Sequence, residues 1–123
     1  MSKINSFEDI NAWQKGREFN KLLYQITEND IFIKVFDLKK QIRRASISIT
    51  SNIAEGFERN TDKEFVYFLY VAKASAGEVR SQLYLAFDLG YIGEDDFLKL
   101  KEQIENISKM LSGLIKYLNI TKA

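Results

Sequence analysis

Apolar residues recur three and four positions apart along most of this 123-residue chain, which is the spacing of one face of an α-helix. Four stretches share this spacing, and short polar or glycine-containing connections separate them. We therefore expect helices over residues 7–28, 37–59, 62–89 and 94–119. Together they predict an all-α fold, an antiparallel up-down-up-down four-helix bundle that forms a single domain over residues 1–123.

The connections carry recognisable start and stop signals. Ser6, followed by Asp9, is expected to cap the first helix, and Thr61 begins the third helix with a capping-box pattern. Gly90 suits the left-handed position just after that helix. Residues 31–36, IFIKVF, could form a short strand by themselves. Because a lone strand has nothing to pair with in a helical chain, we expect a packed connection there instead.

The second and third helices are expected to pack unusually closely. Inward positions of the second helix are mostly small or polar, and a turn near residue 60 places Ala45 and Ser48 opposite Ala72 and Ser75. Small side chains on both sides let two helix backbones approach and gain dispersion contacts. The serine and threonine hydroxyls of the second helix are expected to bond to carbonyls one turn back.

Other residues of these two helices are interpreted as structural. Asn52 lies at the edge of the predicted core and needs hydrogen-bond partners there. Glu55 is placed to pair with Arg59 at i,i+4, which is the favourable orientation for an ion pair on a helix. A role in contacting a ligand is the alternative for both residues. The structural positions are Asn52, Glu55, Gly56 and Glu78.

The third helix is apolar on nearly every side. Its expected core stripe comprises Phe65, Phe68, Ala72, Ser75, Val79, Gln82, Ala86 and Leu89. Its outer flanks, which we expect to form an oligomer interface, carry Tyr67, Tyr70, Val71, Tyr84 and Leu85. A helix of this kind is usually buried all round, whereas a four-helix monomer leaves the outer half of each helix in water.

The size of these flanks favours self-association. Each packed tyrosine would bury on the order of 150–250 Å², while the largest apolar patch of an ordinary monomer is about 300–600 Å². Because the two flanks lie on opposite sides of the core stripe, a heterologous contact that closes into a ring competes with a two-fold dimer. The alternative is a monomer whose tyrosines lie flat with their hydroxyls in water.

A basic cluster opens the second helix and is the main functional signal of the chain. It consists of Lys39, Lys40, Arg43 and Arg44. Cations in the first turns oppose the helix dipole, so we expect compensation by an ion pair between Arg44 and Glu78. The other three cations are then expected to point outward and to meet phosphate. Repeated around a ring, they would form a positive rim, which is typical of proteins that bind RNA or DNA.

Composition limits the possible functions. Lys and Arg number 18 against 17 for Asp and Glu, so the chain as a whole is not a strongly basic nucleic-acid binder. The sequence has no histidine and no cysteine, which excludes Ser-His-Asp and Cys-His triads and histidine-containing di-iron sites. We expect no enzyme activity, no metal, no cofactor and no small-molecule substrate. Without an apolar run near 18 residues or a signal-peptide pattern, a cytoplasmic protein with no membrane partner is expected.

Several motifs together resemble a known family. They are QIRRASISITSNIAEG at residues 41–56, AKASAGE at 72–78 and LGYI at 89–92. The chain resembles the four-helix-bundle proteins encoded within intervening sequences of bacterial 23S ribosomal RNA genes, often labelled S23-type ribosomal proteins. That family in turn resembles the accessory variability determinant of diversity-generating retroelements, a basic pentameric barrel that binds nucleic acid.

The resemblance implies a homopentameric ring of up-down bundles without catalysis. The positions that match the family's motifs are Arg43, Arg44, Asn52, Glu55 and Glu78. We expect a non-catalytic, cyclic homo-oligomer that binds RNA or DNA through the basic start of the second helix. The alternative is a structural protein-interaction scaffold without a nucleic-acid role.

Overall fold

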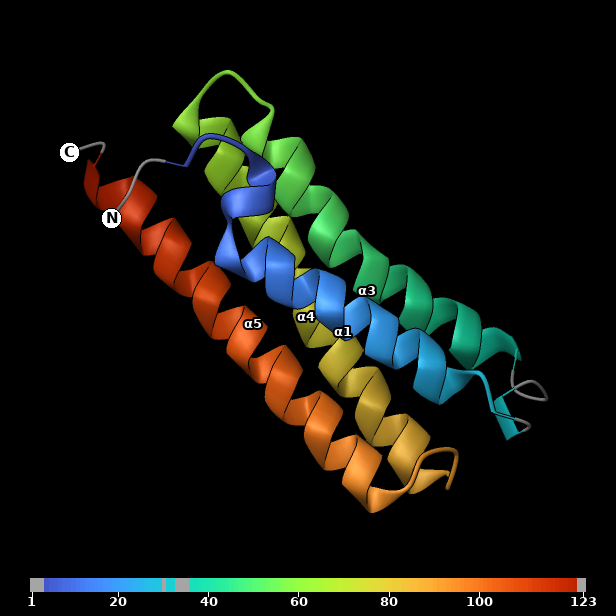
Figure 1. Cartoon of the computed structure of the whole chain (residues 1–123). Helices are drawn as coiled ribbons and strands as arrows, with labels where there is room; N and C mark the ends of the chain where they lie inside the picture. Colours follow the sequence, from blue (N-terminus) through green and yellow to red (C-terminus); the bar gives the residue numbers. More distant parts are fainter. Residues whose placement is uncertain (1–3, 30, 33–35, 122–123) are drawn as a thin grey trace.

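The computed structural model describes residues 4–29, 31–32 and 36–121 (Figure 1). Over these residues the secondary structure is helical and contains no strand, so the all-α prediction is confirmed. The elements are a 3₁₀ turn η1 (Phe7–Asp9) and the helices α1 (Asn11–Thr27), α3 (Phe36–Phe57), α4 (Asp62–Asp88) and α5 (Glu94–Thr121).

The first helix begins later than the sequence predicts. Ile10 is extended, with φ −78° and ψ 120°, and it separates η1 from α1. The backbone N–H of Ser6 donates to the carboxylate of Asp9 at 3.3 Å, so the predicted cap stabilises η1 instead of α1. Ile10 is buried, and the rings of Phe7 and Trp13 meet edge to face at 5.1 Å. Packing of these apolar groups therefore accompanies the break in the helix.

Both ends of α4 follow their sequence signals. The Thr61 hydroxyl accepts a hydrogen bond from the Glu64 backbone N–H at 3.1 Å, as the capping pattern predicts. Beyond the other end, Gly90 has φ 76°, and the N–H of Tyr91 donates to the carbonyl of Ala86 at 2.8 Å. This six-to-one bond after a left-handed glycine is a Schellman motif, which satisfies carbonyls that the helix end would leave unpaired.

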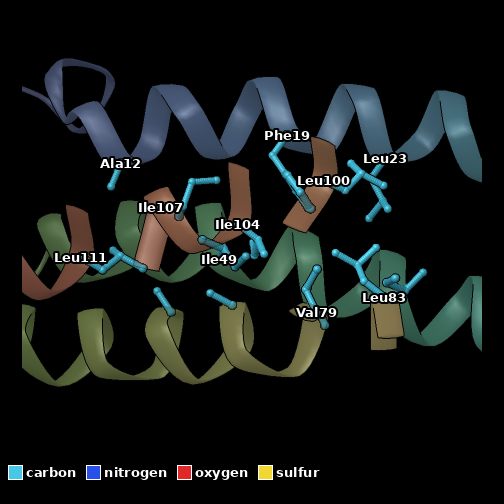
Figure 2. Packing of buried hydrophobic residues seen from close by; sticks show 14 of the residues in the cluster. Ala12, Phe19, Leu23, Ile49, Val79, Leu83, Leu100, Ile104, Ile107 and Leu111 are labelled. Atoms are coloured by element: carbon cyan, nitrogen blue, oxygen red, sulfur yellow. The ribbon is translucent and has the colours of Figure 1, made fainter. Parts of the chain in front are cut away.

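The four helices pack around one contiguous apolar core. α1 and α4 each contact both α3 and α5. In Figure 2 one buried side chain from each helix points into the space between them, namely Phe19, Ile49, Val79 and Ile104. The three-and-four spacing of apolar residues therefore predicts the inward faces well.

The buried stripe of α4 is rotated relative to the sequence prediction. Leu69 and Leu83 are buried, whereas Phe68 and Gln82 are only partly buried. Leu89, predicted to face the core, is exposed because α4 ends at Asp88. The rotation is small, because the other five predicted positions are buried as expected, namely Phe65, Ala72, Ser75, Val79 and Ala86. Both stripes have helical spacing, so periodicity alone does not distinguish the two orientations.

The contact between α3 and α4 is as close as the small residues predict. The hydroxyls of Ser48 and Ser75 lie 2.9 Å apart, and Nδ2 of Asn52 donates to the Ser48 carbonyl at 2.7 Å. A Cβ added to Gly56 would lie only 2.6 Å from Cβ of Phe68. Glycine is therefore required at this position for the two backbones to approach.

Polar residues also join α1 to α3. The Ser46 hydroxyl donates to Oδ1 of Asn20, and Nδ2 of Asn20 donates to the Thr50 hydroxyl at 3.2 Å. A Cβ at Gly16 would lie 2.7 Å from Cγ2 of Thr50. The prediction that these hydroxyls bond to carbonyls one turn back is wrong for Ser46, whose hydroxyl bonds to Asn20 of another helix. It is confirmed for Thr50, whose hydroxyl also donates to the Ile47 carbonyl at 3.1 Å.

The segment at residues 31–36 is described only in part. Phe32 is fully buried, and its ring meets Tyr91 edge to face at 5.7 Å. Its backbone N–H donates to Oδ1 of Asn29 at 2.9 Å. These contacts agree with a packed connection, while residues 33–35, for which it was also predicted, lie outside the described part of the chain.

Candidate nucleic-acid interface

The four cations at the start of α3 line one open hollow on the surface. Because they occupy two successive i,i+4 pairs, they share one side of the helix. The hollow has a volume of about 460 Å³, and it is lined by Tyr24, Lys39, Lys40, Arg43, Arg44 and Ile47. No acidic residue is among those that line it. The sequence prediction that these cations form one cluster is therefore consistent with the geometry of this hollow.

Arg43 anchors the hollow to the end of α1. Its Nε donates to the Thr27 hydroxyl at 2.9 Å, and its Nη2 donates to the Tyr24 carbonyl at 3.1 Å and to the Glu28 carboxylate at 2.7 Å. The guanidinium also lies over the Tyr24 ring, 4.1 Å from its centroid. Arg43 therefore holds several partners at once, and its side chain is only 16% exposed.

Glu28 neutralises part of the basic cluster. Its carboxylate lies 3.3 Å from Nζ of Lys39, in addition to its contact with Arg43. The hydrogen bonds from Arg43 and then Lys39, together with their positive charges, lower the pKa of Glu28 below its ordinary value of 4.5. The carboxylate therefore remains ionised at neutral pH and bridges the two cations.

This bridge corrects the predicted compensation of the helix dipole. Glu78 accepts a hydrogen bond from Gln82 at 3.3 Å, and no ion pair joins Glu78 to Arg44 among the described residues. Likewise, Lys39 and Arg43 do not simply point outward, because Glu28 holds both of them. A carboxylate after the last turn of α1 and cations in the first turns of α3 each oppose their own helix dipole, so pairing them relieves both helices.

Three residues of this network were not predicted from the sequence as site residues, namely Tyr24, Thr27 and Glu28. Glu28 did carry a usable signal, since an acidic residue at the C-terminal end of a helix is unfavourable unless a cation lies near it. Thr27 is 1% exposed, and its hydroxyl donates to the Leu23 carbonyl at 2.7 Å. Nothing in the sequence distinguishes it from an ordinary buried threonine.

Arg44 contrasts with Arg43. It is exposed and lines the hollow. It forms no ion pair with any acidic side chain in the described part of the chain. Arg44 is therefore a cation of the hollow that no carboxylate of the described residues holds, and Lys40 beside it is also exposed.

The structural positions predicted from the sequence have the following surroundings. Glu55 pairs with Arg59 at 3.1 Å, as the i,i+4 spacing predicts. Asn52 and Gly56 lie at the contact with α4, where Asn52 donates to Ser48 and Gly56 faces Phe68. Glu55, Asn52 and Gly56 are not among the residues that line the basic hollow.

The outer flanks of α4 are open in the single chain. Tyr67 is 64% exposed, and Tyr70, Tyr84 and Leu85 are also exposed, whereas Val71 is partly buried. Tyr84 is covered in part, because its ring meets that of Phe97 in α5 edge to face at 5.1 Å. The helix therefore presents several large apolar side chains that remain largely exposed in the single chain. Such a surface is available for contact with another protein surface.

Among the described residues, no group of three Asp, Glu, His or Cys side chains is arranged to hold a metal ion. No helix in that part of the chain combines the length and the apolar character needed to cross a membrane.

Four packed helices, with a basic hollow lined by residues of α1 and α3, define an all-α four-helix protein with a candidate anion-binding surface. Residues 8–113 match the family model described as 23S rRNA-intervening sequence protein. The chain therefore belongs to the 23S rRNA-intervening sequence protein family, which confirms the resemblance seen in the sequence.

A solved structure agrees with this assignment. The chain is similar to a protein of unknown function from the S23 ribosomal protein family of Bacteroides thetaiotaomicron VPI-5482, with 28% sequence identity and a TM-score of 0.79. The similarity covers 85% of this chain and 98% of that protein. Comparison with curated proteins gives no match.

Proposed function

We propose that this protein is a non-catalytic, cytoplasmic, single-domain protein that binds RNA or DNA through the basic hollow at the start of α3. One observation carries the proposal. Four cations of one helix side line a single hollow that no acidic residue lines, although the whole chain has a net charge of only +1. Local positive potential of this kind attracts phosphate.

The arrangement of the cations supports an anionic ligand. Lys39 with Arg43, and Lys40 with Arg44, are like-charge i,i+4 pairs, which destabilise a helix by about 0.2–0.5 kcal/mol each. Glu28 relieves the first pair. Arg44 pairs with no acidic side chain in the described part of the chain, so a phosphate placed there would gain charge-assisted hydrogen bonds from its guanidinium.

A binding titration with charge-matched variants tests the proposal. Fluorescence anisotropy would compare wild type, the Lys40→Ala/Arg44→Ala double variant and a Lys99→Ala/Lys109→Ala control that removes two exposed cations from α5. We expect the α3 variant to bind a labelled RNA at least tenfold more weakly and the α5 control to bind nearly as wild type. Equal losses in both variants would show that only total charge matters and would refute this site.

We also propose that the fold is an antiparallel up-down-up-down bundle that assembles into a cyclic homo-oligomer, with a pentamer preferred. Contacts between α3 and α4 support the antiparallel pairing, because Ser48 meets Ser75 while the later Gly56 meets the earlier Phe68. The exposed tyrosines of α4 support the assembly, since they form a surface that a second copy can bury. A ring would repeat the basic hollow around its rim and raise avidity for one nucleic-acid strand.

A scaffold for another protein is the second candidate function. The exposed aromatic flank of α4 favours it, because tyrosine is enriched where protein surfaces meet. Nucleic-acid titration separates the two candidates: a pure scaffold shows no salt-sensitive binding to RNA or DNA, whereas the basic hollow requires it.

A further inference from the structure

We propose that the basic hollow takes one unpaired nucleotide, so that the protein binds single-stranded nucleic acid in preference to duplex. This inference rests on the proposed function and specifies its ligand. It is drawn from the shape of the hollow, from the apolar residues among its cations and from the contacts that hold its wall in place.

The shape suits a single nucleotide. The hollow has a volume of about 460 Å³, which is within the roughly 300–1,000 Å³ of small-ligand pockets, but it is a wide-open surface hollow that a strand can cross and not an enclosed cavity. A duplex offers a convex phosphate backbone with its bases stacked inside, so a base enters a hollow only if it is first flipped out at a cost. A single strand has no pairing to break. Concavity therefore favours the unpaired strand.

The lining of the hollow combines cations that can bind a phosphate with apolar side chains that can pack against a base. Arg44 and the adjoining Lys40 suit a phosphate, while Tyr24 and Ile47 provide an aromatic and an aliphatic surface in the same hollow. Tyr24 is 37% exposed and Ile47 is 42% exposed. Tyr24 packs on the Arg43 guanidinium, whereas the exposed part of its ring and the Ile47 side chain are apolar surface that lies in water beside the cations. A base can pack on this surface while its phosphate meets the cations, and base–aromatic stacking is sequence-tolerant.

The aromatic wall is held in position before any ligand binds. The Arg43 guanidinium covers one face of Tyr24 at 4.1 Å while it bonds to Thr27 and Glu28. The ring is thus fixed by a charged group that is itself fixed by three partners. A preorganised wall loses little conformational entropy on binding, which raises affinity. Arg43 is in this reading a positioning residue, and Arg44 is the residue that contacts phosphate.

The test compares one labelled, unstructured RNA strand with the same strand annealed to its complement, by anisotropy titration at fixed salt. The variants are Ile47→Ala and Tyr24→Leu, and Leu98→Ala is the matched control because Leu98 is 51% exposed on α5. Circular dichroism verifies that each variant is folded. Ile47→Ala keeps the test decisive if Tyr24→Leu unfolds, since Ile47 is largely in water already.

We expect wild type to bind the single strand about tenfold more tightly than the duplex, and each wall variant to lose about five- to tenfold for the single strand only. The Leu98→Ala control should keep the wild-type affinity for both the single strand and the duplex. Equal, salt-sensitive affinity for both forms, unchanged by Ile47→Ala, would overturn this inference and leave the proposed function standing. Absence of binding to either form would overturn the proposed function itself. A mononucleotide that binds as tightly as the strand would also overturn the assignment to a strand.

Discussion

Replacement of Gly56 by alanine tests the close packing of α3 against α4 most sharply. A Cβ at this position would lie 2.6 Å from Cβ of Phe68 and 3.0 Å from Cδ1 of Phe65. The Phe68 Cβ is attached directly to the backbone of α4 and cannot rotate away, so the two helices must separate. Overpacking of this kind costs about 1–3 kcal/mol.

The backbone effect acts in the opposite direction. Alanine is favoured over glycine inside a helix by about 0.8–1.0 kcal/mol. The two effects together lower the free energy of unfolding of Gly56→Ala by up to about 2 kcal/mol, and we expect a loss in the upper part of that range because the Phe68 Cβ cannot move aside. Gly113→Ala is the matched control, because nothing lies within 4 Å of the Cβ it would add and the position is exposed in α5. It should gain about 0.5–1 kcal/mol.

Equilibrium urea unfolding, followed by circular dichroism, measures both changes. Titrations at several protein concentrations are needed because self-association would add concentration-dependent stability. The reasoning fails if Gly56→Ala is as stable as wild type, or if it gains stability as Gly113→Ala does. Either result would mean that α3 and α4 have room for a methyl group between their backbones.

Two further predictions concern charge and assembly. The pKa of Glu28 is lowered in the folded state, so its contribution to stability is present above the ordinary value of 4.5 and is lost as pH falls through the lower folded value. The difference in unfolding free energy between wild type and Glu28→Gln should therefore shrink as pH falls from 4.5 through the lower folded pKa, and a difference that stays constant over this window would contradict the ion-pair account. Tyr70→Glu and Tyr84→Glu on the exposed flank of α4 should lower the oligomer mass measured by light scattering, whereas the equally exposed Leu98→Glu on α5 should not. A wild-type mass equal to one chain would refute the proposed ring.

Much of the fold follows from local chemistry. Helix spacing predicts the four helices, and the cap at Thr61 and the left-handed Gly90 predict both ends of α4. These signals act within a few residues, so they can be read without knowing the tertiary arrangement. The break at Ile10 is different, because it accompanies packing against the core that spacing alone does not reveal.

The site was predictable only in part. The sequence predicts the basic cluster. Which acidic residue pairs with each cation depends on how each helix is rotated about its axis and on which helices are neighbours. An antiparallel estimate places Arg44 and Glu78 at the same height without placing them on facing sides. The bridge from Glu28 to Arg43 crosses from α1 to α3, and no short-range pattern connects those two positions.

The salt dependence of RNA binding tests the central claim most directly. For single strands, the logarithm of the binding constant falls with the logarithm of salt concentration by about 0.7 for each phosphate neutralised. Lys40 and Arg44 bind the same phosphate in this account, so the Lys40→Ala/Arg44→Ala variant should flatten the slope by roughly 0.7 relative to wild type, while Lys99→Ala/Lys109→Ala should leave it unchanged. Identical slopes for wild type and the α3 variant would mean that no phosphate is bound in the hollow, and the account would be wrong.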